Sequence, residues 1–563
     1  MYHSHKILNF APLNSRLQEK LTRELEIPKM LAQILINRGI TDLRQAEKFI
    51  NVKLADLLDP FSFSDMAKVV LRIKQALRKK EKVMIFGDYD VDGIAGIAIL
   101  EHSLKKMGID TQHYIPHRIK EGYGLAKNIL KLAGERMINL LITVDCGTSN
   151  IREVEDLKRH NIDTIITDHH EFLGQALPEA IGIINPKIKK STYKYRELAG
   201  VGVAYKLCQA LSGSRLAEEL DLVTLGTIAD VVPLTGENRV IVKEGLKILP
   251  QTKRPGLKAL IKKAGIKNKE FNSAFVSFIL GPRLNASGRM GSAEVSLRLL
   301  MSDDEVEAEE LAGVLEECNR TRQRVESKIL EEAEVIINKE VNFKEHKVIV
   351  VAKEGWHQGV LGIVASKLAD RFYRPAIVIS LNEKMCKGSG RSIKNFHLFH
   401  ALGECKEFLH SFGGHTHAVG LMITRDNIGN FRDSINRLAQ DKLSLGDLLP
   451  SLEIDMELSL SDLNAESVKE LEKLEPFGAG NPEPLFYTRG LKLKGEPKDL
   501  ARETIKFWVT DGKNTREVIG FGMSNLKTSL KEANTFDLVY AARIDNWLGD
   551  SSVILEAKDI FFR

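Results

Sequence analysis

Residues 82–108 read KVMIFGDYDVDGIAGIAILEHSLKKMG, which is an apolar run, then three closely spaced aspartates, then a helical pattern. The run KVMIF (82–86) is short and continuous, as expected for a strand buried on both faces of a parallel sheet. The segment from 93 to 108 has the spacing of the following helix. A strand, an acidic turn and a helix in this order indicate one unit of an α/β fold.

The same alternation continues on both sides of this unit. MAKVVLRIKQALRKK (66–80) has helical apolar spacing before it. Four further strands are predicted after it, with helical patterns between them: TQHYI (111–115), NLLITV (139–144), DTIIT (163–167) and IGII (181–184). Repeated strand–helix units predict a parallel sheet with helices on both faces.

A long charged helix is predicted in the middle of the chain. Residues 302–340 contain Gly313 but no other Gly or Pro, and Ser302 is a suitable N-cap with acidic residues in the first turn. One helix of this length would span roughly 55 Å at 1.5 Å per residue. We expect it to join two domains.

The later part of the chain predicts a second α/β unit and then a β-barrel. HKVIVVA (346–352) and PAIVIS (375–380) look like strands, and alternating β patterns follow residue 446. The expected domain boundaries are 1–65 for a partly helical lead-in, 66–240 and 341–445 for the two α/β domains, 241–301 for a helical extension, 302–340 for the linker helix and 446–563 for the barrel.

Composition limits the class of protein. The chain has 563 residues and a formal net charge of +5, so it is weakly basic, and a nucleic-acid footprint must be local. Its five cysteines are scattered without a CxxC pair, which argues against a disulfide framework and a zinc ribbon. The N-terminus lacks a signal-peptide core, and no apolar run reaches the roughly 18 residues of a membrane span. We expect a soluble, cytoplasmic protein without a membrane partner.

Three aspartates leave the first predicted strand together. Asp88, Asp90 and Asp92 alternate, so they point to one side of the chain. Three like charges are costly there unless a cation holds them. Two other interpretations remain open, a helix N-cap and a calcium loop. Capping by Asp92 would not explain the other two, and no glutamate closes a twelve-residue calcium loop.

Three more motifs place metal-binding groups where strands or helices end. Asp145 follows a strand in TVDCG (143–147), and Asp168, His169 and His170 follow another in TDHH (167–170). Open α/β sheets form their sites beyond the carboxyl ends of the strands. Asp230, in TIADVVPL, lies at a helix end, either as a turn contact or as a ligand.

Carboxylate and imidazole ligands together suit Mn²⁺ or Mg²⁺ better than zinc. Several carboxylates can hold two such ions roughly 3.5–4 Å apart, with one aspartate bridging. The sequence therefore predicts a centre of two divalent ions that catalyses phosphoryl displacement.

A second group of motifs has the composition of a phosphate-binding surface. Arg283, Arg289 and Arg391 lie beside glycines or small residues, and Gly413, Gly414 and His415 form another small-residue loop. Such loops let guanidinium and backbone N–H groups approach phosphate, although glycines also serve ordinary turns. Gly359 precedes a helix whose N-terminus suits an anion.

Basic and aromatic residues elsewhere suit a single strand of nucleic acid. KIKKSTYKYR (187–196) interleaves five basic residues with Tyr193 and Tyr195, and is also typical of a solvated loop. Phe507, Trp508 and Trp547 are candidates either for base stacking or for core packing.

The four acidic motifs, in this order, resemble the metal motifs of the DHH phosphoesterase superfamily. Residues 357–379, GSGRS (388–392) and GGHTHAVG (413–420) resemble the DHHA1 domain paired with it. GPRLNASGRMG (281–291), the linker helix and the β domain are similar to the RecJ exonucleases. The resemblance implies an α/β fold of DHH and DHHA1 domains joined by a long helix, with a C-terminal OB-like barrel.

The resemblance also implies roles for individual residues. The metal ligands would be Asp88, Asp90, Asp92, Asp145, His169 and Asp230, with Asp145 bridging the two ions. His170 would assist catalysis beside the scissile phosphate, and Asp168 would orient a ligand. The substrate-binding residues would be Arg118, Arg283, Asn285, Arg289, Ser389, Arg391, Gly413, Gly414 and His415. Among these, Arg118, Arg283, Ser389 and Arg391 would bind the 5′ end.

The expected activity is 5′-to-3′ degradation of single-stranded DNA to 5′-mononucleotides in recombination and repair. A cleft between the two α/β domains would admit single strands only. Single-strand-binding protein and a repair helicase are the expected partners. One alternative is a DHH phosphodiesterase acting on short oligonucleotides, cyclic dinucleotides or pyrophosphate, although such relatives are shorter. Another is a non-catalytic scaffold, against which the complete Asp/His set argues.

Overall fold

The computed structural model describes residues 6–126, 128–172, 174, 176–265, 271–545 and 552–563, which form two compact units. The first unit contains Leu57–Val232 and Glu244–Pro450. The second contains residues 6–56, Pro233–Lys243 and Ser451–Arg563. Among the described residues, no helix is both long and apolar enough to span a membrane.

The first unit begins with a five-stranded parallel sheet in the order β3-β2-β4-β5-β6. Its strands are β2 (Val83–Gly87), β3 (Thr111–Tyr114), β4 (Leu140–Val144), β5 (Asp163–Thr167) and β6 (Gly182–Ile184). Every residue of β2 and β4 is buried, which explains their continuous apolar runs. The predicted parallel sheet is confirmed.

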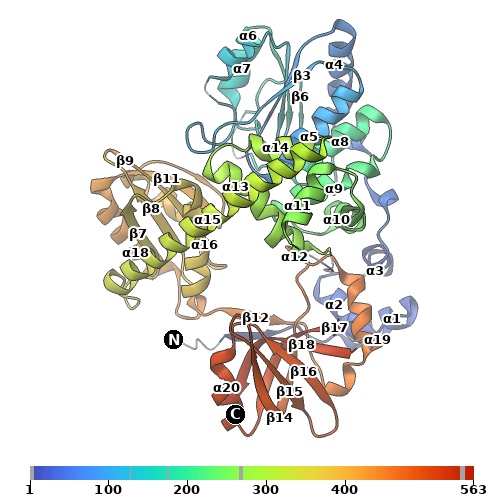
Figure 1. Cartoon of the computed structure of the whole chain (residues 1–563), viewed down its shortest axis with the longest axis vertical. Coiled ribbons are helices and arrows are strands. Elements are labelled where there is room, and N and C mark those ends of the chain that lie inside the picture. Colours follow the sequence, from blue (N-terminus) through green and yellow to red (C-terminus); the bar gives the residue numbers. More distant parts are fainter. Residues whose placement is uncertain (1–5, 127, 173, 175, 266–270, 546–551) are drawn as a thin grey trace. The chain divides into compact units, whose positions relative to one another are not determined.

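Helices cover both faces of this sheet (Figure 1). On one face, Met84, Phe86 and Leu141 pack with residues of α6 (Ile129–Glu135) and α7 (Ile151–Arg159). The other elements of this part are α4 (Met66–Lys79), α5 (Val91–Lys106), α8 (Gly200–Ser212) and α9 (Leu220–Ala229). Helix α5 lies close against the sheet, because a Cβ on its Gly96 would come within 2.5 Å of Cγ1 of Val144.

The linker is α15 (Glu305–Glu340), preceded by short helices. These are α10 (Gly236–Ile248), α11 (Pro255–Lys263), α12 (Ser273–Phe275), α13 (Gly281–Met290) and α14 (Glu294–Met301). The predicted N-cap of the linker was wrong. Asp304 caps it by accepting from the backbone N–H of Glu307, whereas the Ser302 hydroxyl donates to the Glu307 carboxylate. Figure 1 shows α15 running between the two α/β parts of this unit.

The second sheet of the unit has the order β10-β11-β9-β8-β7. Its strands are β7 (Ile349–Glu354), β8 (Ala376–Leu381), β9 (Met385–Arg391), β10 (Leu409–Gly414) and β11 (Ala418–Thr424). Only β7 and β8 pair in parallel. Helix α16 (Leu361–Phe372) and α15 share an apolar cluster with one face, while α17 (Leu398–Glu404) and α18 (Ile428–Lys442) cover the other.

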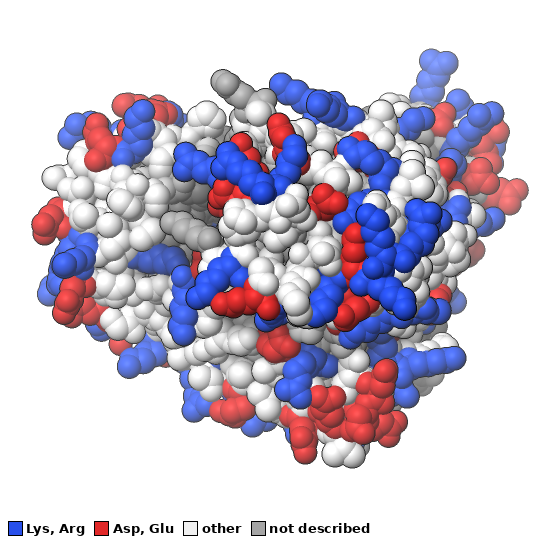
Figure 2. Space-filling model, turned by 90° about the horizontal axis from the view of Figure 1, so that it is seen from above, with Lys and Arg blue, Asp and Glu red and all other residues white. Residues whose placement is uncertain are grey.

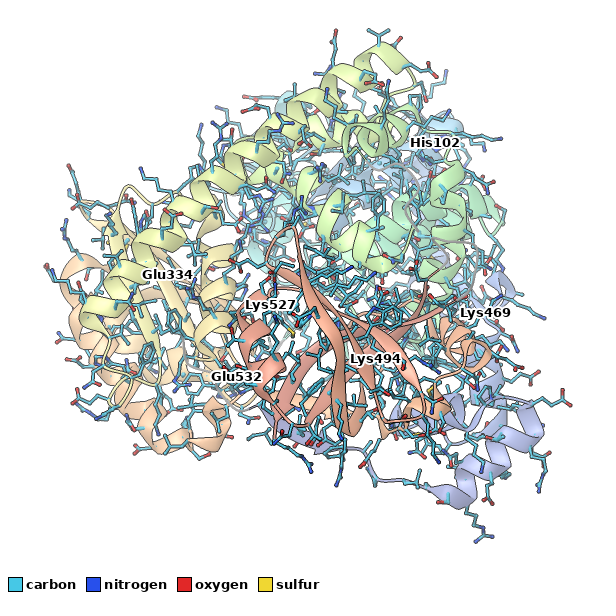
Figure 3. All side chains as sticks on the ribbon, turned by 60° about the horizontal axis from the view of Figure 1, so that its bottom comes forward. His102, Glu334, Lys469, Lys494, Lys527 and Glu532 are labelled. Atoms are coloured by element: carbon cyan, nitrogen blue, oxygen red, sulfur yellow. The ribbon has the colours of Figure 1, made fainter. Side chains whose placement is uncertain are left out.

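The second unit is built on a five-stranded barrel, as predicted. Pairing runs β14-β15-β16-β18-β17 and returns from β17 to β14. The strands are β14 (Phe486–Leu500), β15 (Thr504–Thr510), β16 (Thr515–Gly520), β17 (Phe536–Asp545) and β18 (Ser552–Phe562). Helix α20 (Lys527–Glu532) is joined to β14 by the Lys527–Asp499 ion pair at 2.6 Å, and Figure 3 labels Lys527 on that helix.

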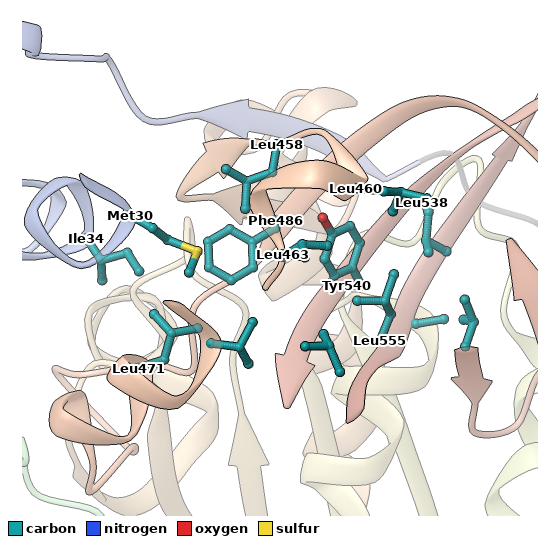
Figure 4. Packing of buried hydrophobic residues seen from close by; sticks show 14 of the residues in the cluster. Met30, Ile34, Leu458, Leu460, Leu463, Leu471, Phe486, Leu538, Tyr540 and Leu555 are labelled. Carbon is teal, nitrogen blue, oxygen red and sulfur yellow. The ribbon is translucent and has the colours of Figure 1, made fainter. Parts of the chain in front are cut away.

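The N-terminal residues are part of this second unit. Strand β1 (Ile7–Phe10) pairs in parallel with β12 (Ser451–Ile454) beside the two-residue strand β13 (Met456–Glu457). The helices of the unit are α1 (Ser15–Leu25), α2 (Lys29–Asn37), α3 (Leu43–Ile50) and α19 (Ala465–Lys469). Met30 and Ile34 of α2 share a core with Phe486 and Leu471 (Figure 4). The lead-in expected from the sequence therefore packs with the barrel.

Candidate active site

The register of the first sheet brings the acidic motifs to one level. Gly87 of β2 is paired with Val144 of β4, which is paired with Thr167 of β5. The next residue of each strand is therefore an aspartate at the same edge: Asp88, Asp145 and Asp168. This confirms that the strand ends deliver carboxylates to one place.

The backbone turns sharply at Asp145 to direct its carboxylate. Asp145 has φ of +61°, in the left-handed region that non-glycine residues rarely adopt. Gly200, the first residue of α8, lies so close that a Cβ there would be 2.5 Å from Oδ1 of Asp145. A strained residue held by a close glycine is typical of a functional site.

Asp90 and Asp92 are both used as helix caps, each for a different helix. Asp90 caps α5, accepting from the N–H groups of Asp92 and Gly93. Asp92, considered from the sequence as the cap of α5, instead accepts from Gly200 and Val201 at the start of α8. Both carboxylates are thereby fixed in direction while retaining lone pairs for a cation.

Seven side chains fall into three overlapping groups, and within each group the ligand atoms lie close together. Nε2 of His169 lies 3.1 Å from Asp145, 3.5 Å from Asp230 and 3.8 Å from Asp92. Overlapping groups whose ligand atoms lie within 4.8 Å of one another are Asp92–His169–Asp230, Asp88–Asp90–Asp145 and Asp145–His169–His170. The structure thus brings together all six predicted metal ligands, with Asp145 shared between groups.

The electrostatics of this cluster fit a bound cation. Among the described residues, Oδ1 of Asp88, Oδ1 of Asp145 and Nε2 of His169 are buried without a hydrogen-bond partner. Burial, followed by repulsion between the carboxylates, raises the pKa of Asp92 to about 7 and those of Asp88, Asp145 and Asp230 well above the ordinary range. Burial lowers the pKa of His169 to about 3, so its imidazole is neutral, as a metal ligand requires.

The carboxylate of Asp168 holds His169 and His170 in place through hydrogen bonds. One of its oxygens accepts from the N–H groups of His169 and His170 and lies 2.9 Å from Nδ1 of His170. Its other oxygen accepts from the N–H of Thr148. These hydrogen bonds lower the pKa of Asp168 and, outweighing burial, raise that of His170.

The sequence prediction missed Tyr123. Its hydroxyl donates to the carbonyl of Asp145 at 3.1 Å and lies 2.8 Å from Nδ1 of His170. Gly122 and Gly124 flank it with φ of +86° and +87°. A tyrosine between two glycines in a loop after a strand is the signal that could have identified it.

Three of the predicted substrate arginines form one group. Burial and then the charge of Arg118 lower the pKa of both Arg289, to about 9, and Arg391. None of the three has a carboxylate ion pair among the described residues; the Arg118 guanidinium lies over the Tyr89 ring, and Arg289 donates to the carbonyl of Gly359. Partly buried, mutually repelling guanidinium groups favour an anionic ligand.

Ser389 and Arg391 extend this group to the start of α16. A Cβ on Gly362 would come within 3.1 Å of Oγ of Ser389 and 3.2 Å of Nη2 of Arg391. Helix α16 begins at Leu361, so its N-terminal N–H groups add to the positive potential there. This arrangement can bind a phosphate group.

Two other predicted substrate residues make internal contacts. Arg283 donates to Glu316 of α15 at 2.8 Å and to the carbonyl of Ile279. Asn285 accepts from the N–H of Val91 at the start of α5, beside Asp90. Their predicted contacts with substrate remain predictions.

The glycine-rich loop of the second sheet reaches the histidines. The His415 ring stacks on that of His170 with centroids 6.1 Å apart. Gly414 has φ of +133°, and a Cβ there would lie 2.3 Å from the carbonyl oxygen of Ala418. Gly413 precedes it in β10. The loop therefore places His415 beside the candidate catalytic residue.

Several predicted stacking residues are otherwise engaged. Tyr193 is buried, and its ring stacks on that of Phe63 with centroids 3.8 Å apart. Phe507 is buried in the barrel core. Trp508 is exposed, while Trp547 lies outside the described residues. On the face in Figure 2, Lys and Arg are interspersed with Asp and Glu. On this face, positive charge is therefore not gathered into one large basic patch.

Comparison with known families agrees with this architecture. The DHH family, N-terminal domain, matches residues 82–227; the DHHA1 domain matches 345–441; and the RecJ OB domain matches 454–559. These ranges contain the first sheet, the second sheet and the barrel.

Individual proteins are similar over nearly the whole chain. The single-stranded-DNA-specific exonuclease RecJ of Bacillus subtilis is 41% identical over 96% of this chain and 69% of its own length. The crystal structure of RecJ from Thermus thermophilus with Mn²⁺ superposes with a TM-score of 0.84 at 28% identity, covering 99% of this chain and 80% of the other. Its complex with Mg²⁺ gives 0.78 at 27% identity, covering 99% and 78%.

Proposed function

Because this chain belongs to the RecJ family of single-stranded-DNA-specific exonucleases, we propose that it degrades single-stranded DNA from the 5′ end to 5′-mononucleotides. The observation that carries the proposal is the buried Asp/His cluster, whose unpaired atoms Asp145 Oδ1 and His169 Nε2 lie 3.1 Å apart. Two acceptor atoms so close in a buried site favour a shared cation.

The ligands divide into two overlapping sets. Asp90 and Asp145, with Asp88 adjoining, would hold one divalent ion; Asp92, Asp145, His169 and Asp230 would hold the other. When bound, a pair of Mn²⁺ or Mg²⁺ ions supplies an activated water and stabilises the leaving oxygen of an in-line displacement. Oxygen and imidazole ligands fit both ions.

The side chains around the ions have separate tasks. Asp168 and Tyr123 fix the His170 ring through Nδ1, so that the imidazolium carries its charge beside the scissile phosphate. His415 stacks against this ring from the second sheet and limits access of water. Gly413 and Gly414 let the backbone of that loop approach the substrate closely.

The 5′-to-3′ direction of digestion follows from an anion-binding site beside the metal ligands. Arg118, Ser389 and Arg391 would bind the 5′-terminal phosphate, with Arg283 supporting the site through α13. The charge of Asp90 acts on Arg289, and Asn285 accepts from the N–H of Val91, the residue after Asp90; both link the phosphate site to the metal ligands. A held 5′ end leaves only the first phosphodiester at the metal cluster, so cleavage releases one nucleotide at a time.

We place this activity in DNA recombination and repair. The substrate is a single strand of DNA, and single-strand-binding protein and a repair helicase are the proposed partners. They would generate and present the strand.

The decisive experiment is digestion of a long single strand labelled at either end, with Mn²⁺, Mg²⁺ or chelator. We expect immediate release of the 5′ label as mononucleotide with metal, and none with chelator or with Asp145→Ala. Survival of long strands while dinucleotides or pyrophosphate are hydrolysed would assign the chain to another DHH activity. Binding without cleavage under either metal would indicate a scaffold.

A further inference from the structure

Strand β6 ends in a buried asparagine beside the candidate catalytic histidine. Ile184 of β6 is paired with Thr167 of β5, so Asn185 follows β6 at the level where Asp168 follows β5. The N–H of Asp168 donates to the carbonyl of Ile184 at 3.1 Å, which continues this register past the last paired residues. Asn185 is fully buried. A fourth strand end therefore contributes a polar side chain to the edge that carries the three aspartates.

The amide of Asn185 uses both its N–H groups and its oxygen. Its Nδ2 donates to the carbonyl of His170 and to Oγ1 of Thr148, both at 3.0 Å, and its Oδ1 accepts from the N–H of Lys187 at 2.8 Å. Because a backbone carbonyl only accepts and a backbone N–H only donates, these partners decide which end of the amide faces His170. A buried amide with three such partners is held in one orientation.

Thr148 closes a ring of hydrogen bonds around the histidine. It is buried, and its N–H donates to Oδ2 of Asp168 at 3.0 Å. Oδ1 of the same carboxylate accepts the N–H of His170 at 3.1 Å and lies 2.9 Å from its Nδ1. His170 is thus held at its N–H and its ring by Asp168, and at its carbonyl by Asn185.

These contacts fix the backbone on both sides of the His170 Cα. Asp168 holds the peptide group before the residue, and Asn185 holds the peptide group after it. The directions open to a side chain depend on the backbone that carries it, through the rotamers that this backbone allows. A displacement of about 1 Å at a reacting centre can lower the rate about 100-fold. The hydrogen bond from Asn185 therefore bears on the geometry of the His170 ring, although it contacts the backbone and not the ring.

We propose that Asn185, supported by Thr148, positions His170 for its part in phosphodiester cleavage. Both are positioning residues, since within the described part of the chain neither belongs to a group of candidate metal ligands, and they act through Asp168 and the His170 backbone. The inference rests on the proposed function, in which His170 assists catalysis beside the scissile phosphate. It extends the site from the aspartates and histidines to the end of β6.

The test removes the Asn185 amide with and without the His170 ring. Asn185→Ala eliminates all three hydrogen bonds and is made in the full-length protein and in His170→Ala. Digestion of 5′-labelled single-stranded DNA with Mn²⁺ and an excess of enzyme measures the maximal rate, and Mn²⁺ titration measures metal affinity. Thr148→Val removes the hydroxyl group from the ring of hydrogen bonds at similar volume, whereas Thr148→Ser retains it.

Asn436→Ala is the matched control. Asn436 is also buried, and its amide makes three hydrogen bonds with the backbone of Val348 and Arg432. These bonds connect α18 to the residue before β7 and not to the candidate active site. We expect Asn436→Ala to lower the melting temperature, as Asn185→Ala does, but to leave the maximal rate of the folded protein unchanged.

We expect Asn185→Ala and Thr148→Val to lower the maximal rate about 10–100-fold, while Mn²⁺ affinity stays unchanged. Thr148→Ser should cleave like the unchanged protein. In His170→Ala, the further loss caused by Asn185→Ala should be about twofold or less, because the group that it positions is already absent.

An equal fold-loss with and without the His170 ring, or the same loss in Asn436→Ala, would overturn the positioning role while the proposed function stands. Lost Mn²⁺ binding in Asn185→Ala would overturn it as well, since the amide would then act on the metal ligands. If the unchanged protein cleaves no single strand, the proposed function fails and this inference fails with it.

Discussion

Nδ1 of His170 lies 2.9 Å from Oδ1 of Asp168, and the same oxygen accepts the N–H groups of His169 and His170. One buried carboxylate thus orients both the candidate catalytic histidine and a candidate metal-binding histidine. Asp168 belongs to none of the three groups of candidate metal ligands. Its contacts therefore favour a role in orienting the two histidines over a role in binding metal.

Asp168→Asn should lower kcat about 10–100-fold, since groups that orient ligands and catalytic side chains commonly contribute that much. Without the negative charge the pKa of His170 falls, so the limb of the pH–rate profile that belongs to His170 moves to lower pH. Steady-state digestion of labelled single strands across pH measures both effects. Asp156→Asn, on the exposed side of α7, is the control. An unchanged profile with reduced kcat would contradict the role assigned to this hydrogen bond.

Gly200→Ala should weaken metal binding while the protein still folds. A Cβ there would lie 2.5 Å from Oδ1 of Asp145, and the Gly200 N–H also binds Asp92, so two ligands move together. We expect Mn²⁺ affinity to fall about 10–100-fold and the free energy of unfolding to fall by about 1–3 kcal/mol. Calorimetric titration and denaturant melts measure the two quantities.

Gly134→Ala is the matched control for this change. Gly134 lies in α6 with open space around its Cα, so alanine should stabilise the helix by about 0.5–1 kcal/mol and leave Mn²⁺ affinity unchanged. Normal Mn²⁺ affinity in Gly200→Ala would show that the carboxylates can rearrange.

Strand positions and ligand residues were predictable because they depend on local pattern. A continuous apolar run such as Leu140–Val144 is a buried strand, and in a parallel sheet its end necessarily lies beside the ends of its neighbours. The alternating β pattern after residue 446 likewise predicts the barrel. The family resemblance added the OB-like character of the barrel and the roles of the individual ligands.

Contacts between distant segments could not be predicted in this way. Asp92 caps α8 rather than α5, which depends on a helix more than 100 residues later meeting it. The pairing of β1 with β12 and the Arg283–Glu316 ion pair likewise depend on tertiary packing rather than on sequence period. Tyr193 shows the same limit. The composition of segment 187–196 suggested that it stacks on nucleic-acid bases, but its ring stacks on that of Phe63 instead.

Arg391→Ala should make the enzyme less sensitive to the chemistry of the 5′ end. If Arg391 binds the terminal phosphate, its loss raises KM for a 5′-phosphorylated strand about tenfold or more and changes KM for a 5′-hydroxyl strand far less. Competition between the two strands measures the ratio directly. Arg437→Ala, exposed on α18, is the control. An equal rise for both strands would place Arg391 on the path of the strand rather than at its end.

The stability gained from Mn²⁺ should increase with pH. Burial and then the charge of Asp90 raise the pKa of Asp92 to about 7, against 3.8 for an ordinary aspartate. In the metal-free protein the resulting proton uptake stabilises the folded state fully below pH 3.8, and this contribution is lost as pH rises through about 7. The pKa values of Asp88, Asp145 and Asp230 shift in the same direction.

Metal replaces these protons, so its effect on stability is small at low pH and large above neutrality. Thermal melts with Mn²⁺ or chelator between about pH 5 and 8 should therefore diverge as pH rises, and Asp145→Asn should reduce the divergence. A Mn²⁺ increment in melting temperature that stays constant over this range would mean that the carboxylates are already ionised without metal.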